Sequence, residues 1–178
     1  MKRFGSLVVV ALALGLLAGV PVAAEDGGPG AAYVRNLEFV GDRAVQLAGA
    51  IPADKYGWAP MEGVRNVAQA AMHMAGANYF FAGQMGTPPP EGVDPSGRES
   101  GSGEDEVVAA LAASLEHRKT AFMAVEDPSK EMDIFGRPGT LEDMMMIAIG
   151  HVHEHFGQLI AYARSNEVVP PWSQPSDG

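Results

Sequence analysis

Three of the five histidines of this chain stand in one run, His151-Val152-His153-Glu154-His155. A β-strand would put all three imidazoles on one face, as in the HxH ligand pattern of β-barrel metal enzymes. An α-helix turns by about 100° per residue, so it would put His151 and His155 about 40° apart and His153 on the opposite side. The flanking residues are rich in Met, Leu and Ala and carry no hairpin signals, which favours the helix.

The helical interpretation places two imidazoles in the middle of an apolar stripe. Within about 80° of His151 in the same projection lie Met144, Ala148, Val152, Leu159 and Tyr162. Buried imidazole nitrogens need partners, and two charged imidazoles one turn apart repel each other. A divalent metal ion can instead bind one nitrogen from each ring at about 2.0–2.1 Å. The spacing therefore predicts that His151 and His155 bind a metal ion.

His73 is the candidate for a third ligand. An apolar stripe surrounds it on its own predicted helix, formed by Ala70, Ala77, Phe80 and Phe81. His117 is followed by Arg118 and Lys119, and we interpret this polar run as surface. His153 is expected to face solvent or a second copy of the chain. Three neutral imidazoles with one or two waters would make an open site of the catalytic kind.

Four segments with helical periodicity must position these histidines. They span residues 31–50, 64–85, 104–125 and 140–166. Long connections rich in Gly, Pro and acidic residues follow the second and third segments, at 86–103 and 126–139. This pattern predicts an all-α fold, a four-helix bundle. Gly150 and Gly157 each cost a helix about 1 kcal/mol relative to Ala, so we expect a close helix approach beside the His pair.

The composition argues against several other kinds of site. The 178 residues hold 22 acidic and 12 basic side chains, a formal net charge of −10, which is unsuited to binding nucleic acid. The lack of Cys excludes disulfides, thiolate ligands and a Cys nucleophile, so any metal ligands are nitrogen or oxygen. The His run does not have the HExxH spacing of zincin proteases. A bundle that holds haem through His and Met ligands is a further alternative, although the sequence lacks the CxxCH motif of covalent haem attachment.

Residues 1–24 have the features of a secretory signal peptide. Lys2 and Arg3 precede an uncharged, largely apolar run over residues 4–22, and small residues lead to Ala24. We expect cleavage after Ala24, which leaves residues 25–178 as one domain in the periplasm or outside the cell. The alternative is a retained membrane anchor, because about 20 apolar residues can span a bilayer. No later segment of the sequence is apolar for long enough to do so.

Three stretches of the sequence resemble the DinB/YfiT-like family of metal-binding four-helix bundles. They are residues 58–65 with 72–79 (WAPMEGVR, MHMAGANY), residues 151–159 (HVHEHFGQL) and residues 169–172 (VPPW). The resemblance covers about residues 33–172 and implies a metal triad of His73, His151 and His155 that holds a divalent ion, most often zinc or nickel. Characterised relatives include transferases and isomerases that use low-molecular-weight thiols, and some members look like hydrolases.

Two functions are compatible with these residues. The first is an exported metal-dependent hydrolase or thiol-dependent transferase, in which the ion activates water or the thiol of a small-molecule substrate. Asn78 and Tyr79 are candidates for the mouth of its site; the sequence identifies no other catalytic group. The alternative is a non-catalytic exported bundle that holds a metal or a small ligand. The two differ in whether turnover accompanies metal binding.

We predict that the exported protein begins at Glu25. The basic start, the apolar run and the small residues before position 25 are the features that signal peptidase recognises. The intact mass of the exported protein measures this directly. A mass that includes residues 1–24 would indicate a membrane-anchored protein instead.

Overall fold

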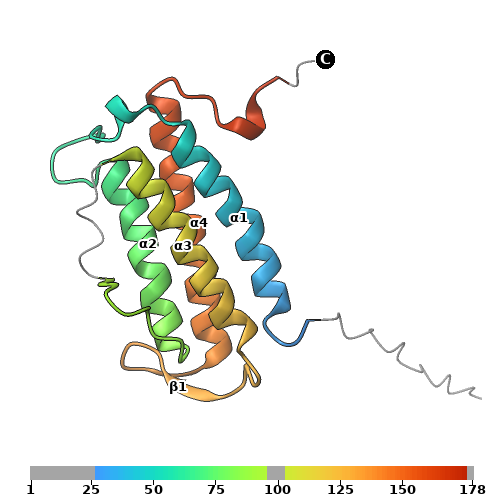
Figure 1. Ribbon diagram of the computed structural model, residues 1–178. Helices are drawn as coiled ribbons and strands as arrows, with labels where there is room; N and C mark the ends of the chain where they lie inside the picture. The colour runs from blue at the N-terminus through green and yellow to red at the C-terminus, as the bar shows by residue number, and fades with distance from the viewer. Residues whose placement is uncertain (1–26, 96–102, 176–178) are drawn as a thin grey trace, which may run out of the picture.

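A computed structural model describes residues 27–95 and 103–175, so the predicted signal peptide lies outside the described residues. Four helices run side by side: α1 (Ala31–Ala50), α2 (Val67–Gln84), α3 (Glu104–Met123) and α4 (Leu141–Ser165) (Figure 1). Within the described residues, the 3-10 turn η1 (Ala53–Lys55) follows α1 and the 3-10 turn η3 (Pro171–Ser173) follows α4. The predicted all-α four-helix bundle is confirmed.

Capping boxes fix the starts of the two helices that carry the predicted metal ligands. Before α2, the side chain of Asn66 accepts a hydrogen bond from the Gln69 backbone, and the Gln69 side chain accepts one from the Asn66 backbone. Before α4, Thr140 and Asp143 make the same reciprocal pair. Each box satisfies backbone N–H groups that the helix itself leaves unpaired. The box at Asn66 begins α2 three residues later than the periodicity predicted.

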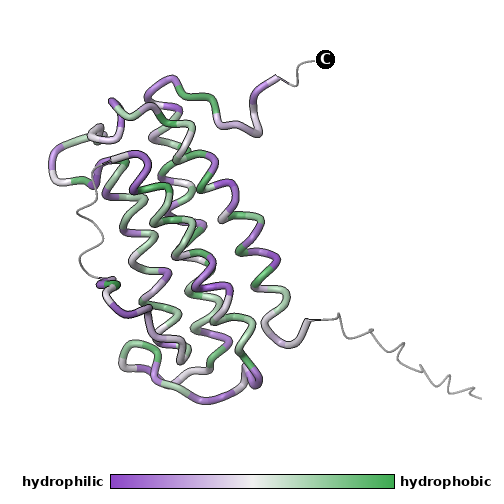
Figure 2. The backbone as a smooth tube through the Cα atoms, in the orientation of Figure 1, coloured by the Kyte–Doolittle hydropathy of each residue, from purple (hydrophilic) through white to green (hydrophobic). Residues whose placement is uncertain are grey.

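The helices pack around one apolar core. Both α1 and α2 contact α3 and α4, and in Figure 2 hydrophobic and hydrophilic residues alternate along each helix. The largest apolar side chains without solvent exposure come from all four helices: Val40, Leu47, Met74, Leu111, Phe122, Met144, Met145 and Leu159. Within the described ranges, no helix has the length and apolarity that a membrane crossing requires.

The connection between α3 and α4 forms a β-hairpin that the sequence did not predict. Strand β1 (Glu131–Asp133) pairs antiparallel with β2 (Pro138–Thr140). At its turn, Phe135 and Gly136 have φ angles of 53° and 84°. Two consecutive positive φ angles are typical of a type I′ turn, which usually has Asn or Gly at its first central position. Phe in this conformation is unusual, and it places an aromatic ring at the hairpin tip.

The predicted close helix approach at Gly150 and Gly157 is wrong. No heavy atom lies within 4 Å of the place where a Cβ would stand at either residue, and both face solvent. The close approach occurs instead at Gly41 of α1, where a Cβ would lie 3.1 Å from the side chain of Leu115 on α3. Glycine in α4 therefore has no packing role at these two positions.

We predict that Gly150→Ala and Gly157→Ala each stabilise the protein. Alanine fits the open space at both positions, and it is favoured over glycine in a helix interior by about 0.8–1.0 kcal/mol. The measurement is the free energy of unfolding in urea. Gly30→Ala is the opposing control, because a Cβ there would overlap the backbone carbonyl of Phe122 and the variant should be destabilised. A loss of stability at Gly150 or Gly157 would contradict the open space seen on α4.

Candidate metal centre

The structure brings His73 on α2 together with His151 and His155 on α4. One ring nitrogen from each residue lies within 4.8 Å of those of the other two, and the Nε2 atoms of His73 and His151 are 3.3 Å apart. The ring centroids are 4.4–5.1 Å apart. The convergence follows from the helix phase, because residues four apart on α4 share the face that packs on α2. That these residues bind a metal ion stays a prediction.

A hydrogen-bonded chain orients His155. Its Nδ1 lies 2.8 Å from Oε1 of Gln158, whose Nε2 donates to the hydroxyl of Tyr162, and that hydroxyl donates to the backbone carbonyl of Arg65. An amide oxygen only accepts, so Nδ1 of His155 carries the proton and Nε2 keeps its lone pair. Such outer partners fix the tautomer and direction of a metal-binding imidazole.

His151 is half-buried, and its Nδ1 is buried without a hydrogen-bond partner in the structure. Burial lowers the pKa of His151 from its ordinary value of 6.5 to about 3, and the neighbouring His155 and Arg118 add to this. The ring is therefore neutral at neutral pH, the form that can bind a metal ion. Phe81 packs edge-on to it, with ring centroids 5.5 Å apart.

These residues fit a divalent cation with a preference for imidazole. Two nitrogens bound to one tetrahedral ion at about 2.0–2.1 Å are about 3.3–3.4 Å apart. The Nε2 atoms of His73 and His151 are 3.3 Å apart, which matches this spacing. The neutral state of His151 and the fixed tautomer of His155, which leaves its Nε2 lone pair available, point the same way. A donor set of nitrogens suits zinc or nickel better than magnesium or calcium.

Arg118 is fully buried. The prediction that the polar run of His117, Arg118 and Lys119 lies at the surface is therefore wrong for Arg118. Its guanidinium donates to the backbone carbonyls of Ala148 on α4 and Ala77 on α2, at 2.5 and 3.1 Å. Burial lowers its pKa to about 9, so it is still charged at neutral pH. No ion pair joins it to a carboxylate in the part of the chain that the structure describes. It stands in the core stripe, seven residues after Leu111 and four before Phe122.

The remaining candidates from the sequence lie outside the cluster. His153 is exposed on the opposite side of α4, as predicted, and its Nε2 lies 2.9 Å from Oδ1 of Asn36 on α1. Asn78 and Tyr79 do not line a site mouth. Asn78 is buried and donates to Ser114, and Tyr79 is buried against the ring of His117.

A cavity of about 490 Å³ opens beside the histidine cluster. Its lining consists of His73, Gly76, Ala77, Phe80, Phe81, Asp94, Pro95 and His151. Asp94 is the lining carboxylate, and no sequence motif pointed to it because it stands in the long connection after α2. Phe80 was predicted to be in the core, but it is 43% exposed and forms part of this cavity.

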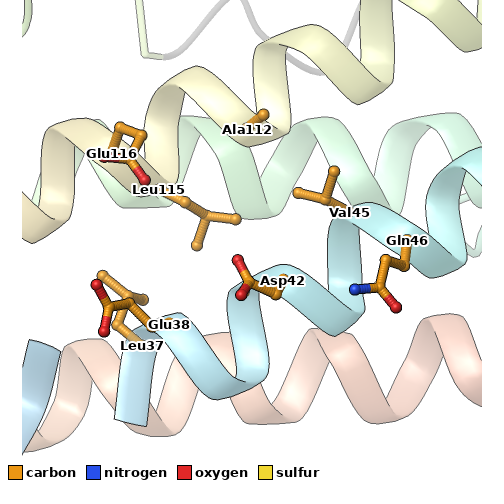
Figure 3. A pocket seen from close by; sticks show the side chains of 9 residues that line it. Leu37, Glu38, Asp42, Val45, Gln46, Ala112, Leu115 and Glu116 are labelled. Atoms are coloured by element: carbon orange, nitrogen blue, oxygen red, sulfur yellow. The ribbon is translucent and has the colours of Figure 1, made fainter. Parts of the chain in front are cut away.

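A second pocket, of about 260 Å³, lies between α1 and α3 (Figure 3). Leu37, Val45 and Leu115 line it together with the carboxylates of Glu38, Asp42 and Glu116. It contains none of the three clustered histidines. Of these two cavities, the one of about 490 Å³ is lined by the clustered histidines His73 and His151.

Comparisons with known proteins agree with this fold. The family model of the DinB superfamily matches residues 36–159. The crystal structure of a DinB-like protein, YjoA from Bacillus subtilis, is similar with a TM-score of 0.63 and 20% sequence identity, covering 82% of this chain and 99% of that chain. At this identity the likeness concerns the fold alone. A search among curated proteins finds no match.

We predict that acid destabilises the metal-free protein through His151. Because folding lowers the pKa of His151 from 6.5 to about 3, the unfolded chain takes up a proton in this range that the folded chain does not. The free energy of unfolding should therefore fall as the pH is lowered from about 6.5 towards 3. His151→Gln should make this fall shallower, as measured by urea unfolding with chelator between pH 7 and pH 4. His153→Gln is the exposed control, and equal slopes for both variants would contradict the prediction.

Proposed function

Because the chain belongs to the DinB superfamily, we propose that it is a metal-binding member in which His73, His151 and His155 hold a zinc or nickel ion. One observation carries the proposal. Three imidazoles from two helices place ring nitrogens within 4.8 Å of one another, in surroundings that keep His151 neutral. We propose further that the protein is a metal-dependent hydrolase or thiol-dependent transferase that acts on a small molecule.

The bound ion would act as a Lewis acid that lowers the pKa of a water or a thiol. The chain itself supplies orientation and shielding. Gln158 and Tyr162 hold the ring of His155, and Phe81 covers one side of His151. Asp94 lines the cavity that His73 and His151 reach, and its carboxylate could accept a proton from a molecule bound there.

A non-catalytic metal- or ligand-binding bundle is the second candidate. Among the described residues that line the cavity, Asp94 is the sole group besides the histidines that could transfer a proton. A catalytic site usually has more than one such group. Assay of the metal-loaded protein with ester, amide and thiol-acceptor substrates separates the two candidates, because the second binds metal without turnover.

Export to the periplasm or cell exterior is part of the proposal, and it rests on the composition of residues 1–24. The location bears on the reaction. Thiols are kept reduced in the cytoplasm, whereas exported proteins meet an oxidising environment. Hydrolysis, for which water is always present, is therefore favoured over thiol transfer.

We predict a graded loss of metal in three histidine variants and one glutamine variant, with a fourth histidine variant as the control. His73→Ala, His151→Ala and His155→Ala should each weaken zinc binding by more than about 100-fold, because loss of an outer partner alone costs about 10–100-fold. Gln158→Ala should fall in that lower range, since it frees the ring of His155. His153→Ala should keep its zinc. Equilibrium dialysis against a competing chelator gives the affinities.

The same preparations test the coupling of metal to folding. An ion that binds only the assembled helices stabilises the folded state, so chelation should lower the melting temperature of the wild type. It should leave that of His151→Ala unchanged. If His153→Ala loses its zinc while His151→Ala retains it, the assignment of the ligands is wrong.

A further inference from the structure

The cavity beside the histidines is larger than the ligand set needs and is mostly apolar. Its volume of about 490 Å³ is about three times the roughly 150 Å³ that accommodates benzene in an engineered cavity. His73 and His151 line it together with apolar groups, namely Phe80, Phe81, Ala77 and Pro95. Space of this size, beside groups that could act chemically, suits an organic molecule with one or two rings.

Aromatic rings form one wall of this cavity and continue beyond it. The rings of Phe80 and Phe81 meet nearly edge to face, with centroids 5.3 Å apart. On its other side Phe80 lies almost parallel to Phe135, at 6.3 Å and 11°. Both Phe80 and Phe135 are exposed, at 43% and 58%. Two solvent-facing aromatic rings next to a candidate site are a surface that a flat apolar ligand would cover.

Phe135 reaches this place at the expense of backbone strain. Its φ angle of 53° is one that a bulky side chain rarely adopts, and Gly136 follows it in the turn. Non-glycine residues in this region persist where the surroundings hold them, and they cluster at ligand-binding sites. The hairpin thus positions Phe80 through Phe135, which contacts Phe80 without being among the residues that line the cavity.

The positive charges near the wall outnumber the single lining carboxylate, that of Asp94, and so favour a neutral ligand over a cationic one. The guanidinium carbon of Arg118 lies over the ring of Phe81, 5.1 Å from its centroid. This cation already occupies one face of the ring, whose negative potential would otherwise attract a cationic ligand. The divalent ion proposed at the histidines would repel a second cation in the same cavity. A neutral aromatic ring can still stack on Phe80 and Phe81, because its positive edge and negative face match theirs.

We propose that this cavity binds the aromatic ring of an uncharged small molecule, and that Phe80, positioned by Phe135, determines the preference. The proposal deepens the proposed function and rests on it, because the ring would belong to the molecule on which the metal centre acts. Asp94 at the cavity would then contact a polar substituent of that molecule.

The test is calorimetric titration of the zinc-loaded protein with three matched probes. They are 2-naphthalenemethanol, its saturated decahydro counterpart, and the naphthylmethyl trimethylammonium cation. The aromatic alcohol should bind at least about tenfold more tightly than either of the others. Equal or tighter binding of the saturated alcohol, or of the cation, would overturn the preference for a neutral ring, as would no binding of the aromatic alcohol.

Variants locate the binding site. Phe80→Ala should weaken binding of 2-naphthalenemethanol at least about tenfold, and Phe80→Tyr should restore it to within about threefold. Phe135→Gly, which suits the positive φ angle while removing the ring, should weaken it by about three- to tenfold. Phe39→Ala is the matched control, because Phe39 is exposed on α1 and does not line the cavity. Unchanged affinity in Phe80→Ala, or an equal loss in Phe39→Ala, would refute the assignment.

Zinc content is measured on each sample before titration, which separates the two proposals. A wild-type protein that takes up zinc but does not bind the aromatic alcohol contradicts this inference and leaves the proposed function intact. A protein that takes up no zinc contradicts the proposed function and this inference with it. Zinc content should be the same in Phe80→Ala and the wild type, because the proposed ligands are the three clustered histidines and Phe80 is not a ligand.

Discussion

Three imidazole rings share one small space between α2 and α4, and each ring has two nitrogens that must be satisfied there. Burial makes the charged form of His151 costly, so a second proton cannot solve the problem. Gln158 satisfies one nitrogen of His155, and the nitrogens of His73 and His151 face each other at 3.3 Å. A shared cation is the partner that can take one lone pair from each ring without adding protons. The positions of the two helices must meet this requirement.

Arg118 ties together the two helices that carry these rings. From α3 it donates to the carbonyl of Ala77, one turn after His73, and to that of Ala148, just before His151. A buried charge without a counter-ion costs free energy, and the two hydrogen bonds to carbonyls offset part of that cost. The guanidinium carbon also lies over the ring of Phe81, so the charge contributes to the electrostatics of the site. The same charge that disfavours protonation of His151 also disfavours a cation in the neighbouring cavity.

The hydrophobic periodicity of the sequence predicted those features that depend on a single helix, namely its extent and which side chains face inward. It predicted four helices, the start of α1 and α3 almost to the residue, and the inward pair His151 and His155 with His153 outward. Periodicity failed where contacts with neighbouring helices decide the outcome. Arg118 was assigned to the surface because it stands in the polar run with His117 and Lys119, whereas it is buried between the helices. The open sides of Gly150 and Gly157 were likewise invisible without the packing. The hairpin was missed because its strands have three residues each and its turn is not Asn-Gly.

The histidine cluster has two chemically different sides. On one side a polar hydrogen-bonded chain runs from His155 through Gln158 and Tyr162 to the carbonyl of Arg65 and holds the ring of His155 in place. A polar pocket of about 720 Å³, lined by Gly63, Val64, Arg65, Gln69 and Gln158, opens on this side. On the other side Phe80 and Phe81 leave an apolar space into which His73 and His151 reach. His73 and His151 line the apolar cavity and not the polar pocket, so a molecule in the apolar cavity lies directly beside the cluster. The α2–α4 half of the bundle thereby carries the histidine cluster and its cavity, and α3 ties these two helices together through Arg118.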